Sequence, residues 1–284
     1  MHRVLKVEGA AVDSGYAGGD APAVSVVIPT RNDAEMLRTC LHLLSRQTRP
    51  AHEIIVVDNA SSDDTPAVCT AAGVRRIPVD LQGIPATAAA GFDAAAGDII
   101  ARLDTDSRPP ADWLERVEAD LAAAGPMTLV TGPADFYGGS PWVRWAGRHV
   151  FLSGYFRVFR LLLGHPPVFG SNFALRREVW QEISRSVVRD NADVHDDVDI
   201  SYRLRPGMTV IYDPALTVGV SSRPLTSWAS FRRHGAMTLT TCRVEFREEA
   251  PLRRRLDRLQ GRRRREVRRF SRRRWGRHGD PPRP

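Results

Sequence analysis

Two aspartates, Asp104 and Asp106, stand two residues apart just after a short apolar run, residues 98–103, that reads as a β-strand. Two carboxylates at the point where a strand opens into a loop can face one side of a site. Hard oxygen ligands of this kind suit Mg²⁺ or Mn²⁺ and, with the cation, a bound diphosphate. An Asp-x-Asp sequence can equally be a solvated turn. The interpretation therefore depends on the elements around the pair.

The first half of the chain alternates between predicted strands and predicted helices. Strands are expected at 24–28, 53–57, 74–77 and 98–103, with helices in the intervening segments. Such alternation predicts an α/β fold with a mostly parallel central sheet flanked by helices. Ligands gather at the carboxyl ends of parallel strands. Thr30, Asp58 and Asp104 all fall at such ends, which favours a shared site.

The second half is less regular. Further strands are expected at 128–131, 210–212 and 216–220, and helices at 112–124, from 176, from 196 and at 225–246. The segment 142–163 is rich in aromatic residues and leucine but is interrupted by arginines.

The positive charge is concentrated at the C-terminus. The chain of 284 residues has a net charge of +8, but residues 247–284 contain 16 Arg against 5 acids, a net of +11. The remaining residues carry a net charge of −3. We therefore expect a flexible N-terminal extension (1–22), a single domain (23–246), and a basic tail (247–284) that is helical or disordered. Leu252, Leu256 and Leu259 follow helical spacing within that tail.

Composition also bears on location. No run approaches the ~18 apolar residues of a membrane span, and residues 1–20 lack the apolar core of a signal peptide. The three cysteines, Cys40, Cys69 and Cys242, follow no zinc pattern and are expected to be free thiols. The expected location is the cytoplasm, with peripheral attachment to the inner face of the plasma membrane left open.

Five motifs, in order and spacing, resemble the family 2 glycosyltransferases, which are inverting enzymes with the GT-A (Rossmann-like) nucleotide-sugar-binding fold. The motifs are residues 26–32, 53–65, 103–106, 170–177 and 196–204. Two departures accompany the resemblance. The Arg-Asn pair that many relatives carry before the Asp-x-Asp strand is replaced at 87–91 by Thr-Ala-Ala-Ala-Gly, and the Gln-x-x-Arg-Trp motif of processive synthases is absent.

The resemblance implies a donor site that binds a UDP- or GDP-linked sugar with a divalent cofactor, Mn²⁺ or Mg²⁺. Asp106, supported by Asp104, is the implied metal ligand. The implied nucleotide-binding residues are Pro29, Thr30, Asn32, Asp58 and Asp104. A bound cation would act as a Lewis acid toward the departing diphosphate.

An acceptor hydroxyl needs a general base at neutral pH. The resemblance places that base at Asp197. The alternative is that Asp196, Asp197 and Asp199 only favour a helix N-terminus electrostatically. Contacts to the acceptor or diphosphate are expected from Gly170, Asn172, Asp196, Ser222 and Arg223, with a simple turn and a solvated arginine as the competing interpretations. His234 is a weaker candidate for a metal ligand.

The predicted function is inverting transfer of a sugar to an acceptor hydroxyl or phosphate, on a glycan or a lipid-linked acceptor of the cell envelope. The alternatives are a sugar-nucleotide nucleotidyltransferase and a non-catalytic binder of sugar nucleotides or nucleic acid. The first normally has a glycine-rich phosphate loop, which residues 28–32 lack. The tail suits an anionic membrane surface, or only increases solubility. Nucleic acid is not the expected partner, because nothing in the tail reads bases.

Overall fold

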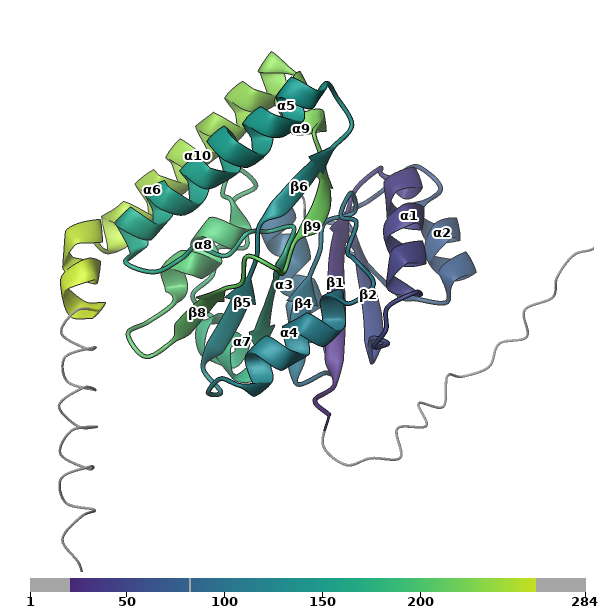
Figure 1. Ribbon diagram of the computed structural model, residues 1–284, viewed down its shortest axis with the longest axis horizontal. Helices are drawn as coiled ribbons and strands as arrows, with labels where there is room; N and C mark the ends of the chain where they lie inside the picture. Colours follow the sequence, from purple (N-terminus) through teal and green to yellow (C-terminus); the bar gives the residue numbers. More distant parts are fainter. Residues whose placement is uncertain (1–20, 82, 259–284) are drawn as a thin grey trace, which may run out of the picture.

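The computed structural model describes residues 21–81 and 83–258. The expected N-terminal extension therefore lies almost wholly outside the described residues, as does the tail beyond residue 258. Within the described ranges a seven-stranded sheet forms the centre, in the order β3-β2-β1-β4-β7-β5-β8 (Figure 1). A two-stranded sheet, β6-β9, lies beside it.

The strands of the main sheet are mostly parallel, as predicted. Only β7 runs antiparallel to its neighbours β4 and β5. The strand bounds are β1 Val24–Thr30, β2 Glu53–Asp58, β3 Arg75–Pro78, β4 Ile99–Arg102, β5 Thr128–Thr131, β6 Ala134–Tyr137, β7 Phe173–Arg176, β8 Thr209–Tyr212 and β9 Val218–Ser221.

Helices cover both faces of the main sheet because its central strands are apolar on both sides. In β1, Val26 and Ile28 face one core and Val27 faces the other. The first core is closed by α1 (Ala34–Leu44), α2 (Thr65–Ala72) and α4 (Trp113–Ala122). The second is closed by α3 (Ile84–Ala94), α7 (Arg177–Ile183) and α8 (Asp196–Arg203).

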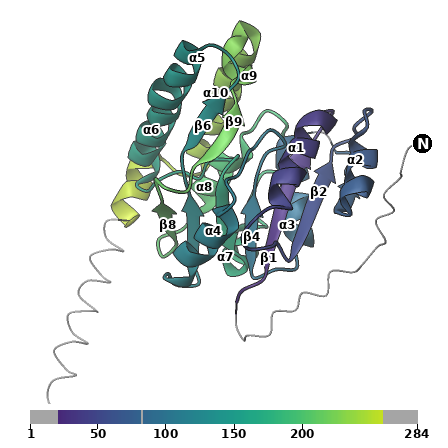
Figure 2. The same ribbon diagram turned by 45° about the vertical axis from the view of Figure 1, so that its right-hand side comes forward.

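A further helical layer covers the β6–β9 side of the molecule (Figures 1 and 2). One continuous helix is formed by α5 (Pro141–Ala146), the π-helical turn η1 (Gly147–Leu152) and α6 (Ser153–Leu163). It lies beside α10 (Trp228–Glu248). Phe159 and Leu163 of α6 form a small third core with Val198 and Tyr202 of α8.

Two predicted boundaries differ in the structure. The helix expected over 225–246 is divided into α9 (Arg223–Thr226) and α10, with Ser227 in extended conformation between them. Residues 251–258 form another helical segment that packs on the body, since Arg254 donates to the carbonyl of Leu204 (2.5 Å). The boundary expected between the domain and the basic tail, at residues 246 and 247, thus falls within a part of the chain that packs on the body. Over the described ranges, no helix is long and apolar enough to cross a membrane.

Candidate active site

The carboxyl ends of β1 and β2 lie side by side, with Thr30 opposite Asp58 in the parallel register. Thr30 is buried, and its hydroxyl has no hydrogen-bond partner among the described residues. Asp58 is fully buried and accepts hydrogen bonds from Arg76 of β3 (2.8 Å) and from the backbone N–H of Ser61 (3.0 Å). Asp58 is therefore paired with Arg76 at this edge of the sheet.

The loop after β1 is joined to the loop after β2. Asn32, at φ 52°, accepts a hydrogen bond from the backbone N–H of Ser62 (2.7 Å), and its own N–H donates to Ser61 (2.9 Å). Asp63 accepts from the backbone N–H of Ala34 at the start of α1 (2.9 Å). These bonds hold the two loops at one edge of the sheet. Pro29 is buried within β1 and contributes no polar side-chain group to this edge.

Asp104 follows β4 at the same edge. One of its oxygens accepts from Arg102 (2.9 Å) and the other from the hydroxyl of Ser171 (2.6 Å). Its backbone N–H donates to Ser107 (3.1 Å), which tightens the turn. The side chain remains about a third exposed. Asp104 is thus oriented by protein donors while it keeps access to a ligand.

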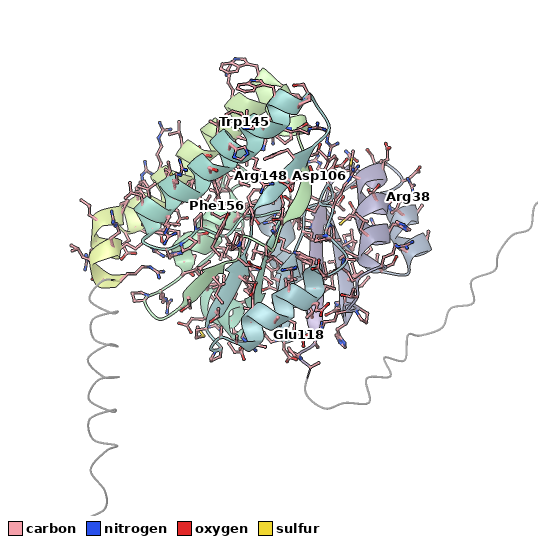
Figure 3. The ribbon with its side chains drawn as sticks, in the orientation of Figure 1. Arg38, Asp106, Glu118, Trp145, Arg148 and Phe156 are labelled. Atoms are coloured by element: carbon pink, nitrogen blue, oxygen red, sulfur yellow. The ribbon has the colours of Figure 1, made fainter. Side chains whose placement is uncertain are left out.

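Asp106 lies between α1 and the β6–β9 side of the molecule (Figure 3). Burial raises the pKa of its carboxyl to about 7, and the neighbouring charge of Asp104 adds to the shift. Arg223 and the backbone N–H of Ser221 act in the opposite direction. The negative charge of Asp106 is thus incompletely balanced by the protein.

The acid pair fits a divalent cation in its donor chemistry. Asp104 and Asp106 supply hard oxygen ligands, and a bound cation would balance the charge that burial opposes on Asp106. In the part of the chain that the structure describes, no three His, Cys, Asp or Glu side chains cluster closely enough to hold a metal alone. A cation held here would take its remaining ligands from a nucleotide diphosphate and water.

Arg102 connects Asp104 to the start of α8. Its guanidinium, buried in β4, bonds Asp104 through Nη2 and Asp196 through Nη1. Burial alone would disfavour the cation, but Asp196 and Asp104 outweigh it and raise the pKa of Arg102. Burial also raises the pKa of Asp196 to about 6, although Arg102 opposes the shift. Asp196 is therefore a buried structural partner, not a group exposed to acceptor or diphosphate as expected.

Asp197, the next residue, faces the site instead. It is half-buried, and its Oδ2 accepts from the backbone N–H of Gly170 (2.9 Å). The hydroxyl of Tyr155, which donates to the carbonyl of Val168 (2.6 Å), lies 3.4 Å from the same oxygen. A Cβ at Gly170 would lie 3.2 Å from that oxygen and 3.3 Å from Arg102, so a side chain there would crowd both. The chain thus presents one accessible carboxylate beside one buried carboxylate.

Arg223 reaches the site through Asp33. Its two terminal nitrogens donate to the two carboxylate oxygens of Asp33 (3.1 and 2.7 Å), and Thr105 also donates to Asp33 (3.2 Å). Arg223 remains half-exposed. Arg223 is thus an exposed arginine oriented by Asp33, and its charge acts on Asp106.

The structure gives three other candidates different places. Asn172 is fully buried, where its amide bonds Trp113 (2.9 Å), Pro133 (3.0 Å) and Leu216 (2.6 Å), so its side chain does not reach a ligand. Ser222 is also buried, and its backbone N–H donates to Tyr137 (2.9 Å). His234 stacks on His195, with ring centroids 5.9 Å apart.

Several residues of the site were not predicted from the sequence. They are Asp33, Arg76, Arg102, Tyr155 and Ser171. Of these residues, only Arg102 could have been recognised from the sequence. It is a charged residue in an otherwise apolar strand, and a buried charge requires a buried partner.

Residues 25–184 match the family model described as Glycosyl transferase family 2. The chain belongs to this family. Glycosyltransferase AglE of Haloferax volcanii is 37% identical over 123 residues, which cover 40% of each protein. An undecaprenyl-phosphate 4-deoxy-4-formamido-L-arabinose transferase of Sodalis glossinidius is 36% identical over 104 residues, 33% of this chain and 32% of the relative. The match thus spans less than half the length of these curated relatives.

Solved glycosyltransferase structures share the GT-A fold of this chain. Glucosyl-3-phosphoglycerate synthase of Mycobacterium tuberculosis, in complex with Mn²⁺, UDP and glucosyl-3-phosphoglycerate, superposes with a TM-score of 0.56 at 21% identity, covering 78% of this chain and 80% of that one. A mannosyltransferase of Pyrobaculum calidifontis, in complex with GDP-Man and Mn²⁺, superposes with a TM-score of 0.60 at 21% identity, covering 81% and 65%. Both neighbours hold a nucleotide and a divalent metal.

Proposed function

We propose that this chain is an inverting, metal-dependent glycosyltransferase that uses a UDP- or GDP-linked sugar. The observation that carries the proposal is the arrangement of Asp197 relative to Asp104. One half-buried carboxylate, that of Asp197, accepts from the backbone N–H of Gly170 and lies against the hydroxyl of Tyr155. A buried guanidinium joins its neighbour Asp196 to Asp104 of the acid pair. A candidate base and a candidate diphosphate site are thereby held in one connected unit.

In the proposed reaction, Asp197 takes the proton of the acceptor hydroxyl as the oxygen attacks the anomeric carbon. The bond from that carbon to the diphosphate oxygen breaks on the opposite face, so the configuration inverts. Asp197 suits this role because one of its oxygens is held by the backbone N–H of Gly170. Among the described residues, its other oxygen bonds only the adjacent N–H of Val198 (2.8 Å). General-base catalysis of this kind contributes about 10²–10⁴ in rate.

The donor end of the site is assigned to residues at the strand termini. Asp104 and Asp106 would hold the cation, whose contribution when bound is to neutralise charge on the departing diphosphate. Arg223, already oriented by Asp33, is placed to donate to a phosphate oxygen. The orphan hydroxyl of Thr30 and the Asp58–Arg76 pair are assigned to the nucleoside.

The acceptor side is assigned to an anionic membrane surface and a lipid-linked acceptor. Of the exposed large apolar side chains in the described ranges, all but Leu81, Ile84 and Tyr212 lie on the layer formed by residues 141–163 and 228–258. The helix from Pro141 to Leu163 carries four arginines and no acid. Aromatic residues interspersed with arginine favour the interface of an anionic bilayer. A relative named for undecaprenyl phosphate is consistent with this assignment.

The decisive experiment measures release of the nucleotide product, UDP, GDP, TDP or CMP, from a panel of UDP-, GDP-, TDP- and CMP-sugars, with Mn²⁺ and with EDTA. We expect Mn²⁺-dependent release from one UDP- or GDP-sugar by the wild type and no release by Asp197→Asn. Donor binding by the variant is measured in parallel by thermal shift. Metal-independent turnover, or equal turnover by Asp197→Asn, would contradict the proposal.

A further inference from the structure

Four arginines surround a hollow at the C-terminal end of α6, away from the candidate active site. Its volume is about 460 Å³, and it is lined by Arg157, Arg160, Leu161, Gly164, His165, Pro166, Arg255 and Arg258. Two arginines come from α6 and two from the segment 251–258, each pair three residues apart. The two helices lie next to each other at this point (Figures 1 and 2). None of the lining residues belongs to the candidate active site.

Three of the four arginines at this hollow have no acidic partner among the described residues. No ion pair with a carboxylate in this part of the chain involves Arg157, Arg160 or Arg255. Arg258 donates to the carbonyl of Leu204 (2.5 Å), which positions its guanidinium at the hollow. The three guanidinium groups of Arg157, Arg160 and Arg255 form a local positive potential.

His165 is the only histidine among the residues that line the hollow. Its imidazole is only 5% exposed, and its Nδ1 lies 2.7 Å from the carbonyl of Pro166, to which it donates. Burial lowers the pKa of His165 to about 3, and the charge of Arg258 contributes to the decrease. The ring is therefore neutral, and the net charge of the hollow is that of its arginines.

We propose that this hollow binds a phosphate group, carried by an anionic phospholipid or by a soluble phosphate ester. Guanidinium groups bind phosphate oxygens through pairs of parallel, charge-assisted hydrogen bonds. The volume lies within the range of small-ligand sites, about 300–1,000 Å³. The site extends the membrane contact proposed above but does not depend on it, since a soluble phosphate meets the same donors.

The surroundings of the hollow contain the apolar surface that a lipid would need. Leu161 lines the hollow and is 60% exposed, while Leu252 and Leu256 are 75% and 58% exposed on the adjacent segment. The helical segment 251–258 turns Arg254 inward and these leucines outward. Acyl chains next to a bound headgroup would cover these side chains.

Phosphate binding is tested on the full chain by calorimetric titration of inorganic phosphate at constant ionic strength. The variants are Arg157→Gln/Arg255→Gln and a matched control, Arg38→Gln/Arg46→Gln. The control removes two exposed arginines from the α1 side of the molecule, where Figure 3 shows Arg38. We expect the pocket variant to raise the dissociation constant at least about tenfold, and the control to leave it unchanged.

The lipid source is tested by sedimentation with phosphatidylcholine vesicles, with and without phosphatidic acid. A selective loss of binding to phosphatidic acid in the pocket variant identifies a lipid headgroup as the ligand. A loss confined to inorganic phosphate identifies a soluble phosphate. Equal losses in the pocket and control variants, in both assays, would show general charge attraction and overturn the proposal, as would unchanged binding in both.

A second variant keeps the test valid if the double substitution unfolds the protein. Leu161→Glu introduces a carboxylate at the exposed edge of the hollow and removes no arginine. It should weaken phosphate binding by a similar factor. Release of nucleoside diphosphate from the donor sugar in water should be unchanged in every pocket variant, so failure of this proposal is distinguishable from failure of the proposed enzyme activity.

Discussion

Asp104 and Asp196 share one buried guanidinium, that of Arg102, although they lie on different elements. Asp104 accepts from Nη2 at 2.9 Å, and Asp196 accepts from Nη1. Asp104 belongs to the loop after β4, and Asp196 begins α8. The link holds the acid pair and the candidate base in a defined relative position.

Replacement of Arg102 by methionine should strongly destabilise the protein. The side chain is 2% exposed, so its loss leaves two carboxylates without their counter-charge. Breaking a buried ion pair costs about 3–5 kcal/mol. The matched control is Arg116→Met, which removes an exposed pair with Asp112 and should destabilise the protein much less. Urea unfolding measures the free energy of unfolding of both variants. Equal decreases would show that the ion pairs of Arg102 contribute no more than an exposed pair.

Replacement of Asp197 by asparagine should abolish sugar transfer without loss of donor binding. The amide keeps the size of the side chain but cannot take a proton, so a decrease of about 10²–10⁴ in turnover is expected. Asp193→Asn, in the exposed loop before α8, is the control. Transfer is measured as diphosphate released with an acceptor present. A parallel loss of donor binding would instead indicate that Asp197 supports the donor site.

Metal removal should abolish the stabilisation that a nucleoside diphosphate provides. A ligand present at a concentration of a hundred times its dissociation constant stabilises the folded protein by about 2.7 kcal/mol. This corresponds to a rise of about 5–10 °C in Tm. We expect this rise with UDP or GDP and Mn²⁺, and its loss with EDTA or in Asp106→Asn. Asp112→Asn, which changes an exposed aspartate, should keep the rise. A rise that persists in EDTA would argue against a cation at Asp106.

Replacement of Glu245 by glutamine should stabilise the protein at alkaline pH. Burial and the nearby charge of Asp199 raise the pKa of Glu245 to about 9 in the folded protein, from 4.5. The folded state therefore binds more protons than the unfolded state between these values, and stability falls as pH rises through this window. Glutamine removes this dependence, with a gain of at least about 1 kcal/mol at pH 9.

The control for this pH effect is Glu248→Gln. Glu248 contacts the same Arg203 but is 56% exposed. Unfolding is followed by urea titration at pH 6 and pH 9. If Glu245→Gln and the wild type lose stability equally between these two pH values, the proton is not held at Glu245.

Replacement of Trp142 and Trp145 by serine should weaken binding to anionic vesicles. The two rings stack at 4.8 Å and are 69% and 47% exposed. The control is Leu81→Ser/Ile84→Ser, an exposed apolar pair of similar exposure on another part of the molecule. Flotation with vesicles containing phosphatidylglycerol is the measurement. Equal flotation of the two variants would show that the α5 surface does not face the membrane.

The sequence predicted the elements whose pattern is local. The strand at 128–131 coincides with β5, and the strands before Asp58 and Asp104 end at one edge of the sheet as expected. Apolar periodicity is sufficient for such elements, because each is recognised from its own residues. The short strand β6 was missed, since its one partner among the described strands is β9, more than eighty residues further along the chain.

The roles of individual polar side chains were harder to predict, because they depend on distant partners. Asp196 and Asp197 are adjacent acids, yet one pairs with Arg102 across the core and the other faces the site. Asn172 stands in a motif that predicts a ligand contact, but its amide is hydrogen-bonded to Trp113 and to two backbone carbonyls. Whether a polar group is free for a ligand is decided by tertiary contacts that no local pattern contains.

The segment 251–258 has a consequence for how shortened forms of this protein are interpreted. Arg254 and Arg258 donate to the carbonyl of Leu204, at the end of the helix that begins with Asp196 and Asp197. A chain that stops near residue 246 removes these donors and leaves the last turn of that helix unsatisfied. If such a form lost activity, the cause would be damage to the helix that carries the candidate base. A chain that stops after Arg258 keeps both donors, so it tests the role of the arginine-rich end alone.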